Sequence, residues 1–315
     1  MECWQITDKK QISKVKIIEN LEQVDDLKIK ITKCFITQKD INLYAGREKA
    51  NYPFIPASIA VGQISETLNE SDYFFKGQKV YLTNNNDNNG YLRDFIVISK
   101  QNCHILPQNV NEFEALFLNH ISIALSVIDS LHIDKGEYVA IVGGSILGNV
   151  IAQLVSYYKA VPIIIDDNDD NLEVARKTDI YYTIKADKLA EKEIINITGG
   201  KKCKKVIYIT DNELSFEYPL SFSAKNAMLA VTGITQTKQK INLNSAFNKA
   251  LNIKFITEGE ENIGTSINLL VQKAVNLNYF KLADYKFDYI SKQFENATNN
   301  LETHNIKTEF TVNLL

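Results

Sequence analysis

The sequence predicts an α/β fold in which a β-rich region precedes a parallel sheet covered by helices on both faces. Three observations predict it. Residues 1–120 contain short strand candidates with β-like alternation, separated by turn residues. Residues 121–262 alternate strand-like runs with helical stretches, which is typical of a doubly wound sheet. A glycine turn within residues 138–148 joins a strand of this second region to a helix.

The glycine turn is the most specific local signal. The apolar run 138–142 leads into glycines, a helical pattern covers 149–158, and a second apolar run, 161–165, is followed by two aspartates. A tight turn, free N–H groups at a helix start and an acid after the second strand together suit a dinucleotide. The residues expected to bind this cofactor are Gly143, Gly144, Ser145, Leu147, Gly148, Asp166 and Asp167.

Several residues of this unit have a physical role of their own. Gly143 permits the tight turn, and Gly148 lets the helix pack close to the strand. Ser145 stands where the usual pattern has a middle glycine, and its hydroxyl can donate to a phosphate. The carboxylates of Asp166 and Asp167 would repel a 2′-phosphate, so NAD(H) is favoured over NADP(H). The alternative is a doubly wound domain that keeps the turn for packing only.

Composition excludes several classes of protein. The chain has 315 residues, a net charge of −3 and 45% hydrophobic residues, which are ordinary values for a globular protein of two domains. No basic face indicates nucleic acid, and no apolar run approaches the roughly 20 residues that span a bilayer. Four separated cysteines and the lack of a signal-peptide pattern favour a cytoplasmic protein without disulfides.

The chain is expected to form two domains, one of them discontinuous. Residues 121–262 would form the nucleotide-binding domain. The tail is too small to bury a core alone, so residues 263–315 would join residues 1–120, with a cleft between the two domains. The elements expected in the tail are a helix over 264–276, a short strand at 279–280, a helix over 287–299 and a strand over 308–312.

The order of several motifs resembles the medium-chain dehydrogenases and reductases, which include zinc alcohol dehydrogenases and quinone reductases. Residues 28–46 resemble that family's strand and catalytic loop, and residues 55–62 resemble its Pro-Gly-His-Glu turn. Residues 75–80 and 90–95 resemble its Gly-Asp-Arg-Val and Gly-x-x-Ala-Glu-Tyr stretches. The resemblance implies a GroES-like catalytic domain, a Rossmann domain that binds NAD(P), and a homodimer or homotetramer.

The residues at the family's catalytic zinc positions differ from zinc ligands. The positions that carry a cysteine, a histidine and a cysteine or glutamate in zinc-dependent members correspond here to Thr37, Ser58 and Asn119. Zn²⁺ prefers thiolate, imidazole or carboxylate ligands. The structural zinc lobe is also missing, because Leu82 leads through a short Asn-rich loop to Gly90. We therefore expect no metal site.

Four residues are candidates for catalysis without a metal. Tyr52 stands ahead of a proline, as in quinone and enoyl reductases, and could protonate or orient an enolate. Lys39 could supply positive charge to a developing oxyanion. Thr37 and Ser58 have hydroxyls in the space that the metal fills in relatives.

Each candidate has a structural alternative. Tyr52 is more often a packing aromatic, Lys39 a solvated lysine, and the two hydroxyls could simply bind water. Asp40 is expected to cap or anchor the loop. His120 could act as a general acid beside the substrate, although a packed histidine is more common.

The favoured function is a zinc-independent, NAD(P)-dependent oxidoreductase that acts on a small alcohol, carbonyl or conjugated carbonyl compound. Its expected partners are this small substrate and further copies of the chain, with neither nucleic acid nor membrane. A non-catalytic nucleotide-binding descendant, acting as a sensor or scaffold, is the first alternative. A zinc-dependent alcohol or polyol dehydrogenase is the second, and it requires a different alignment of the motifs.

Overall fold

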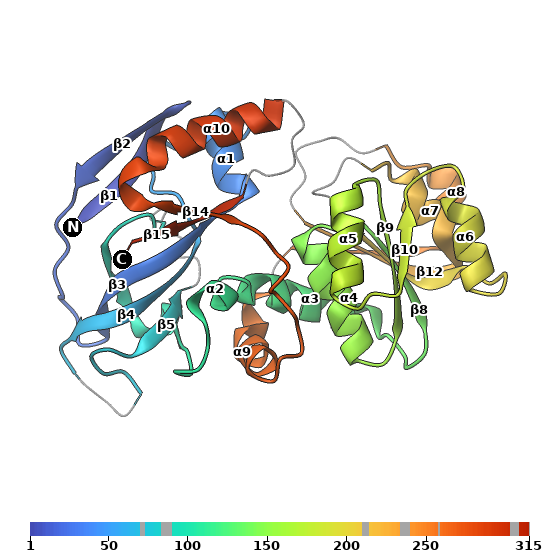
Figure 1. Ribbon diagram of the computed structural model, residues 1–315, viewed down its shortest axis with the longest axis horizontal. Coiled ribbons are helices and arrows are strands. Elements are labelled where there is room, and N and C mark those ends of the chain that lie inside the picture. Colours follow the sequence, from blue (N-terminus) through green and yellow to red (C-terminus); the bar gives the residue numbers. More distant parts are fainter. Residues whose placement is uncertain are drawn as a thin grey trace. The chain divides into compact units, whose positions relative to one another are not determined.

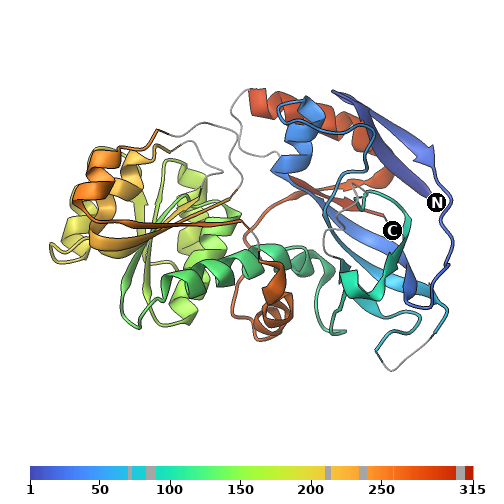
Figure 2. The same ribbon diagram turned by 180° about the vertical axis from the view of Figure 1, so that it is seen from behind.

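The computed structural model describes residues 1–69, 73–82, 90–209, 214–233, 240–257, 259–302 and 309–314. The chain divides into two compact units (Figures 1 and 2). The first contains Met1–Phe117 and Lys281–Leu315, and the second contains Leu118–Phe280. The Asn-rich loop near residues 84–89, which the sequence marks as a loop tip, lies outside the described residues.

The first unit is built on a large, mostly antiparallel sheet. In the described part of the chain this sheet has the order β14-β15-β3-β4-β5-β7, with β6 paired to β3. A hairpin of β1 and β2 forms a separate two-stranded sheet. The strands are β1 (Glu2–Asp8), β2 (Gln11–Lys16), β3 (Asp26–Ile36), β4 (Ile59–Thr67), β5 (Lys79–Leu82), β6 (Phe95–Ser99), β7 (Cys103–Ile105), β14 (Ala283–Lys286) and β15 (Phe310–Asn313).

The helices of the first unit are α1 (Gln38–Ala45), α2 (Glu112–Ala115) and α10 (Ile290–Glu302), with short 3₁₀ turns at Lys100–Asn102 and Phe287–Tyr289. The C-terminal segment completes the core of the first unit, as the sequence predicts. β15 pairs antiparallel with β3, and Phe310 lies opposite Ile36. Phe294 of α10 is fully buried and packs on Tyr44 of α1, with ring centroids 5.2 Å apart.

Two carboxylates occupy the outer edge of β6, which among the described strands pairs with β3 alone. Glu19 accepts hydrogen bonds from the Arg93 guanidinium at 2.6 Å and from the Val97 N–H at 3.0 Å. Asp94 accepts from the Phe95 N–H at 2.8 Å. Arg93 is fully buried, so its ion pair with Glu19 fixes the irregular segment that follows β2.

The second unit contains the parallel sheet, whose order is β10-β9-β8-β11-β12-β13 in the described residues. Counted from β8, this is the order 3-2-1-4-5-6 of a doubly wound dinucleotide-binding fold. The strands are β8 (Tyr138–Val142), β9 (Val161–Asp166), β10 (Tyr182–Lys185), β11 (Cys203–Ile209), β12 (Ser223–Thr232) and β13 (Asn252–Ile256). The sequence predicts all six within a few residues, and four of them, β8, β9, β11 and β12, contain buried apolar runs.

Helices cover both faces of this sheet (Figure 1). Ala140 and Val142 of β8 belong to one apolar cluster with Ile194 of α6 and Leu220 of α7. Alternate strand residues point to opposite faces, so Val139 and Ile141 face the other side. The helices are α3 (Leu118–Leu131), α4 (Ile146–Tyr157), α5 (Asp169–Lys177), α6 (Ala190–Ile197), α7 (Glu217–Phe222), α8 (Leu243–Asn248) and α9 (Ile263–Val271), with a 3₁₀ turn at Glu260–Asn262.

The last helix before the return to the first unit belongs to the second. The sequence places the domain boundary at residue 263, whereas the compact units divide at residue 280. The reason is local packing. Asn262, just before α9, donates a hydrogen bond to the Ser126 hydroxyl of α3 at 2.9 Å, and Ile263 is buried.

The strand predicted at residues 279–280 is wrong. This pair of aromatic residues lies in a turn, in which the Phe280 N–H donates to the Leu277 carbonyl, and the strand that follows is β14. Within the described residues no helix is long and apolar enough to cross a membrane.

Candidate functional site

The turn after β8 has the shape that its glycines predict. Gly143 has φ +108°, in the region that side chains rarely adopt, and its N–H donates to the Ile165 carbonyl of β9 at 2.8 Å. At Gly148 a Cβ would lie 1.9 Å from the Gly143 carbonyl oxygen, closer than any real contact. Gly148 is therefore required by the approach of α4 to the turn, the role that its spacing predicts.

The helix after the turn begins earlier than the hydrophobic pattern indicates. α4 starts at Ile146 rather than at residue 149, and Ser145 is its N-cap. The Ser145 side chain makes no capping hydrogen bond to the helix. The first turn of an α-helix leaves backbone N–H groups without intrahelical partners, and these favour anions. The geometry suits a diphosphate at the start of α4.

Asp166, at the end of β9, is held against the glycine turn. Its carboxylate accepts hydrogen bonds from the N–H of Gly144 at 2.5 Å and of Asn168 at 2.7 Å, and from the Asn171 amide. Burial raises the pKa of Asp166, and these hydrogen bonds act in the opposite direction. The neighbouring Asp167 is exposed. Asp166 thus braces the turn, while Asp167 meets solvent.

In the first unit, Asp40 joins two segments that carry predicted site residues. Its carboxylate accepts from the Thr37 N–H and hydroxyl, both at 2.8 Å, and from the Ala57 N–H at 2.9 Å. Thr37 and Asp40 form the capping box of α1. Burial raises the pKa of Asp40, and the hydrogen bonds from Thr37 and Ala57 oppose that shift. The anchoring role that the sequence suggests for Asp40 is confirmed.

The four catalytic candidates differ in their surroundings. The hydroxyls of Thr37 and Tyr52 already donate, to Asp40 and to the Leu43 carbonyl at 3.0 Å. The Tyr52 ring lies 5.8 Å from that of Phe54, so its packing alternative is supported. The side chains of Ser58 and of the exposed Lys39 make no hydrogen bond with any described residue. These two side chains flank the residues that Asp40 joins.

Asn119 and His120 belong to α3 of the second unit. Burial lowers the pKa of His120 to about 4. The imidazole is therefore neutral at pH 7 and has no proton to give as an imidazolium. This favours the packing interpretation of His120 over the general acid.

The residues at the expected zinc positions do not fit the metal. Thr37 uses its hydroxyl in the capping box, Ser58 offers a second hydroxyl and Asn119 an amide, none of which Zn²⁺ prefers. In the chain as far as it is described, no three His, Cys, Asp or Glu residues gather in a possible metal site. Cys34, three residues before Thr37, is fully buried in β3 and burial raises its pKa.

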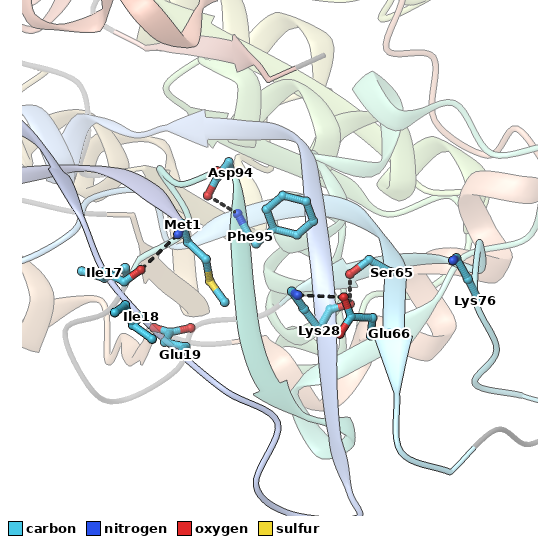
Figure 3. A pocket seen from close by; sticks show the side chains of 10 residues that line it. All are labelled: Met1, Ile17, Ile18, Glu19, Lys28, Ser65, Glu66, Lys76, Asp94 and Phe95. Carbon is cyan, nitrogen blue, oxygen red and sulfur yellow. Dashed lines mark hydrogen bonds and ion pairs between the residues drawn. The ribbon is translucent and has the colours of Figure 1, made fainter.

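A hollow of about 570 Å³ on the first unit is lined by other residues (Figure 3). Lys28 and Glu66, 2.8 Å apart, form an ion pair on its wall, beside Phe95. None of the predicted site residues lines it. Its lining carries both positive and negative side chains, and it contributes nothing to the candidate site.

Comparison with known proteins agrees with this geometry. Residues 23–108 match the alcohol dehydrogenase GroES-like domain. A short chain alcohol dehydrogenase of Escherichia coli, solved with NADH, superposes with a TM-score of 0.84 at 15% identity, covering 100% of this chain and 99% of that one. The chain has the fold of the medium-chain dehydrogenases and reductases.

Two further relatives extend this likeness. A putative zinc-binding dehydrogenase of Sinorhizobium meliloti, bound to NADP, has a TM-score of 0.83 at 14% identity, with 99% of each chain covered. An uncharacterized zinc-type alcohol dehydrogenase-like protein of Haemophilus influenzae is 22% identical over 200 residues. That match spans 63% of this chain and 58% of the relative. The medium-chain resemblance and the α/β fold predicted from the sequence are confirmed.

Sequence reasoning missed two features of the site. The first is the link from Asp40 to Ala57, which joins the start of α1 to the turn before β4. The second is Lys185, which contacts the acidic turn after β9. A capping box is a local signal in sequence, whereas neither of these contacts has a fixed spacing that would reveal it.

Proposed function

We propose that this protein is an NAD(P)-dependent oxidoreductase that acts on a small alcohol, carbonyl or conjugated carbonyl compound. The observation that carries the proposal is the glycine turn. The absence of a side chain at Gly148 lets the Gly143 carbonyl approach closely, and the amino terminus of α4 follows directly after the turn. When bound, the nicotinamide would supply or accept a hydride. The amides of Ile146 and Leu147 would hold the diphosphate, and Asp167 would receive ribose hydroxyls.

NAD(H) is the proposed cofactor rather than NADP(H). The turn after β9 carries Asp166, Asp167, Asp169 and Asp170 within five positions. Negative charge at this place opposes a 2′-phosphate and accepts hydrogen bonds from a 2′-hydroxyl. The relatives solved with NADH and with NADP support dinucleotide binding but do not distinguish between the two.

The chemistry is proposed to proceed without zinc. The side chains of Ser58 and Lys39 have no hydrogen-bond partner among the described residues, so the Ser58 hydroxyl can orient a substrate oxygen and the Lys39 ammonium can stabilise its developing negative charge. Thr37 would position the loop through Asp40. Tyr52 would need to leave the Leu43 carbonyl to donate a proton, so it ranks below Ser58 and Lys39.

Nucleotide binding is tested first. Titration of the protein with NADH, followed by nicotinamide fluorescence, is expected to saturate at micromolar to millimolar cofactor. Absence of saturation at millimolar NADH would refute the proposal. Turnover is then measured with a panel of alcohols, aldehydes, quinones and enones. Lys39→Met and Ser58→Ala are expected to lower turnover while cofactor binding remains.

A non-catalytic nucleotide-binding protein is the second candidate function. It is supported by the internal hydrogen bonds of Thr37 and Tyr52, which leave two of the four candidate groups already occupied. Saturable NADH binding without turnover of any compound in the panel would favour it. Elemental analysis tests the zinc-dependent alternative, because stoichiometric zinc in the purified protein would overturn the assignment of Thr37, Ser58 and Asn119.

A second copy of the chain is the proposed macromolecular partner, in a homodimer or homotetramer. β13 pairs only with β12 among the described residues, and Phe255 on this edge strand is 69% exposed. An exposed edge strand with an aromatic side chain is suited to pairing with another strand. Light scattering after size-exclusion chromatography is expected to show at least a dimer, and Phe255→Lys is expected to shift it to monomer.

A further inference from the structure

Lys185 ends β10 beside the acidic turn that follows β9. In the parallel ladder Lys185 is the register partner of Asp166, so both side chains lie at the carboxyl edge of the sheet. The Lys185 ammonium donates to the Asp167 carbonyl and to the Asp169 carboxylate, the latter at 2.8 Å. The positive charge of Lys185 therefore lies against a turn whose neighbouring aspartates are negative.

Each acid of this turn has a different environment. Asp166 is buried and its carboxylate accepts hydrogen bonds from backbone N–H groups. Asp167, Asp169 and Asp170 are exposed. Of these three carboxylates, only that of Asp169 forms an ion pair in the part of the chain that the structure describes. Of the three exposed aspartates, Asp169 is therefore the one whose carboxylate holds the Lys185 ammonium.

The position of Lys185 matters for the choice of cofactor. In a doubly wound fold the adenosine ribose lies at the carboxyl end of the second strand, which here is β9. A 2′-phosphate at that ribose requires a cation, and a lysine can supply one. Resting on the proposed function, we infer that Asp169 selects against NADP(H) by keeping Lys185 on the turn and away from the 2′ position.

The size of this effect follows from exposure. The Lys185 and Asp169 side chains are 43% and 85% exposed, so water and salt weaken their attraction. An exposed ion pair of this kind corresponds to a change in affinity of about fivefold or less. Loss of the ion pair is therefore expected to raise the affinity for NADP(H) by about that factor. This increase adds to the general effect of removing one negative charge.

The test compares Asp169→Asn with Asp170→Asn. Both variants remove one exposed carboxylate from the first turn of α5, but only the first removes the ion pair that holds Lys185, which is then left with its hydrogen bond to the Asp167 carbonyl. NADPH and NADH dissociation constants are measured by nicotinamide fluorescence at low and at physiological ionic strength. Asp169→Asn is expected to bind NADPH about fivefold more tightly than Asp170→Asn does, with NADH affinity alike in the two. The double variant Asp169→Asn, Lys185→Gln is expected to lose this gain.

The outcomes separate this inference from the function beneath it. Equal NADPH affinity in the two single variants, or a gain that persists without Lys185, overturns the role of the pair while NADH binding upholds the proposed function. Failure of the wild-type chain to bind NADH at all overturns both. The inference is supported if the increase in affinity is confined to NADPH, requires Lys185 and becomes smaller at higher salt.

Discussion

His120 is expected to make the protein less stable as the pH falls from 6.5 to 4. Burial lowers its pKa in the folded chain from 6.5 to about 4. Between these two values the unfolded chain binds a proton that the folded chain does not, so the free energy of unfolding decreases as the solution becomes more acidic. The interval from a pKa of 6.5 to one of about 4 corresponds to about 3.4 kcal/mol at most.

The assay is urea unfolding followed by far-UV circular dichroism at intervals from pH 7 to pH 4, for the wild type and His120→Gln. The variant cannot take up the proton, so its advantage over the wild type is expected to grow by about 1.4 kcal/mol per pH unit once the pH lies well between the two pKa values. His132→Asn controls for removal of an exposed histidine just after the same helix. Parallel curves for the wild type and His120→Gln would refute the reasoning, as would an NMR titration of the His120 ring with a midpoint near 6.5.

Four further changes have defined outcomes. Gly148→Ala places a Cβ 1.9 Å from the Gly143 carbonyl oxygen. It is therefore expected to weaken NADH binding at least tenfold and to destabilise the fold by about 3 kcal/mol in thermal unfolding. The control is Gly264→Ala, whose Cβ would meet no neighbouring atom within 4 Å outside its own helix and should be neutral or stabilising. Arg93→Met leaves Glu19 without its cation and should cost about 2–4 kcal/mol in urea unfolding; a loss below 0.5 kcal/mol would contradict this. Lys254→Met removes a hydrogen bond of 2.7 Å to the Ser130 carbonyl at the end of α3 and should cost about 1 kcal/mol, measured in the same way. Asp40→Asn places an amide opposite N–H donors at Thr37 and Ala57, and hydrogen exchange at those two amides should accelerate; unchanged exchange would show that Asp40 does not anchor them.

Sequence reasoning succeeded where the physical signal is local. β8 occupies Tyr138–Val142, as its buried apolar run predicts, and Gly143 and Gly148 serve the predicted roles because a tight turn and a close helix leave no room for side chains. The apolar pattern predicts a start for α4 that is three residues late. Apolar periodicity marks the buried face of a helix, whereas Ser145 marks its beginning.

The failures arise where long-range contacts decide. Tyr279 and Phe280 look like a strand by residue type, yet Phe280 is buried in a turn and the paired strand is β14, whose exposed and half-buried residues carry no alternation. Tyr52 was a candidate proton donor because a proline follows it. Its hydroxyl donates to the Leu43 carbonyl, nine residues earlier, a partner that no sequence pattern identifies.

The carboxylates on the outer edge of β6 make this edge a poor place for a foreign strand to pair. An open strand edge recruits foreign strands through its free N–H groups, and this is a common route to aggregation. Glu19 and Asp94 already satisfy two of those donors, at Val97 and Phe95. An incoming peptide would have to displace both acids and strip Arg93 of its counter-ion, so pairing of a foreign strand at β6 is disfavoured.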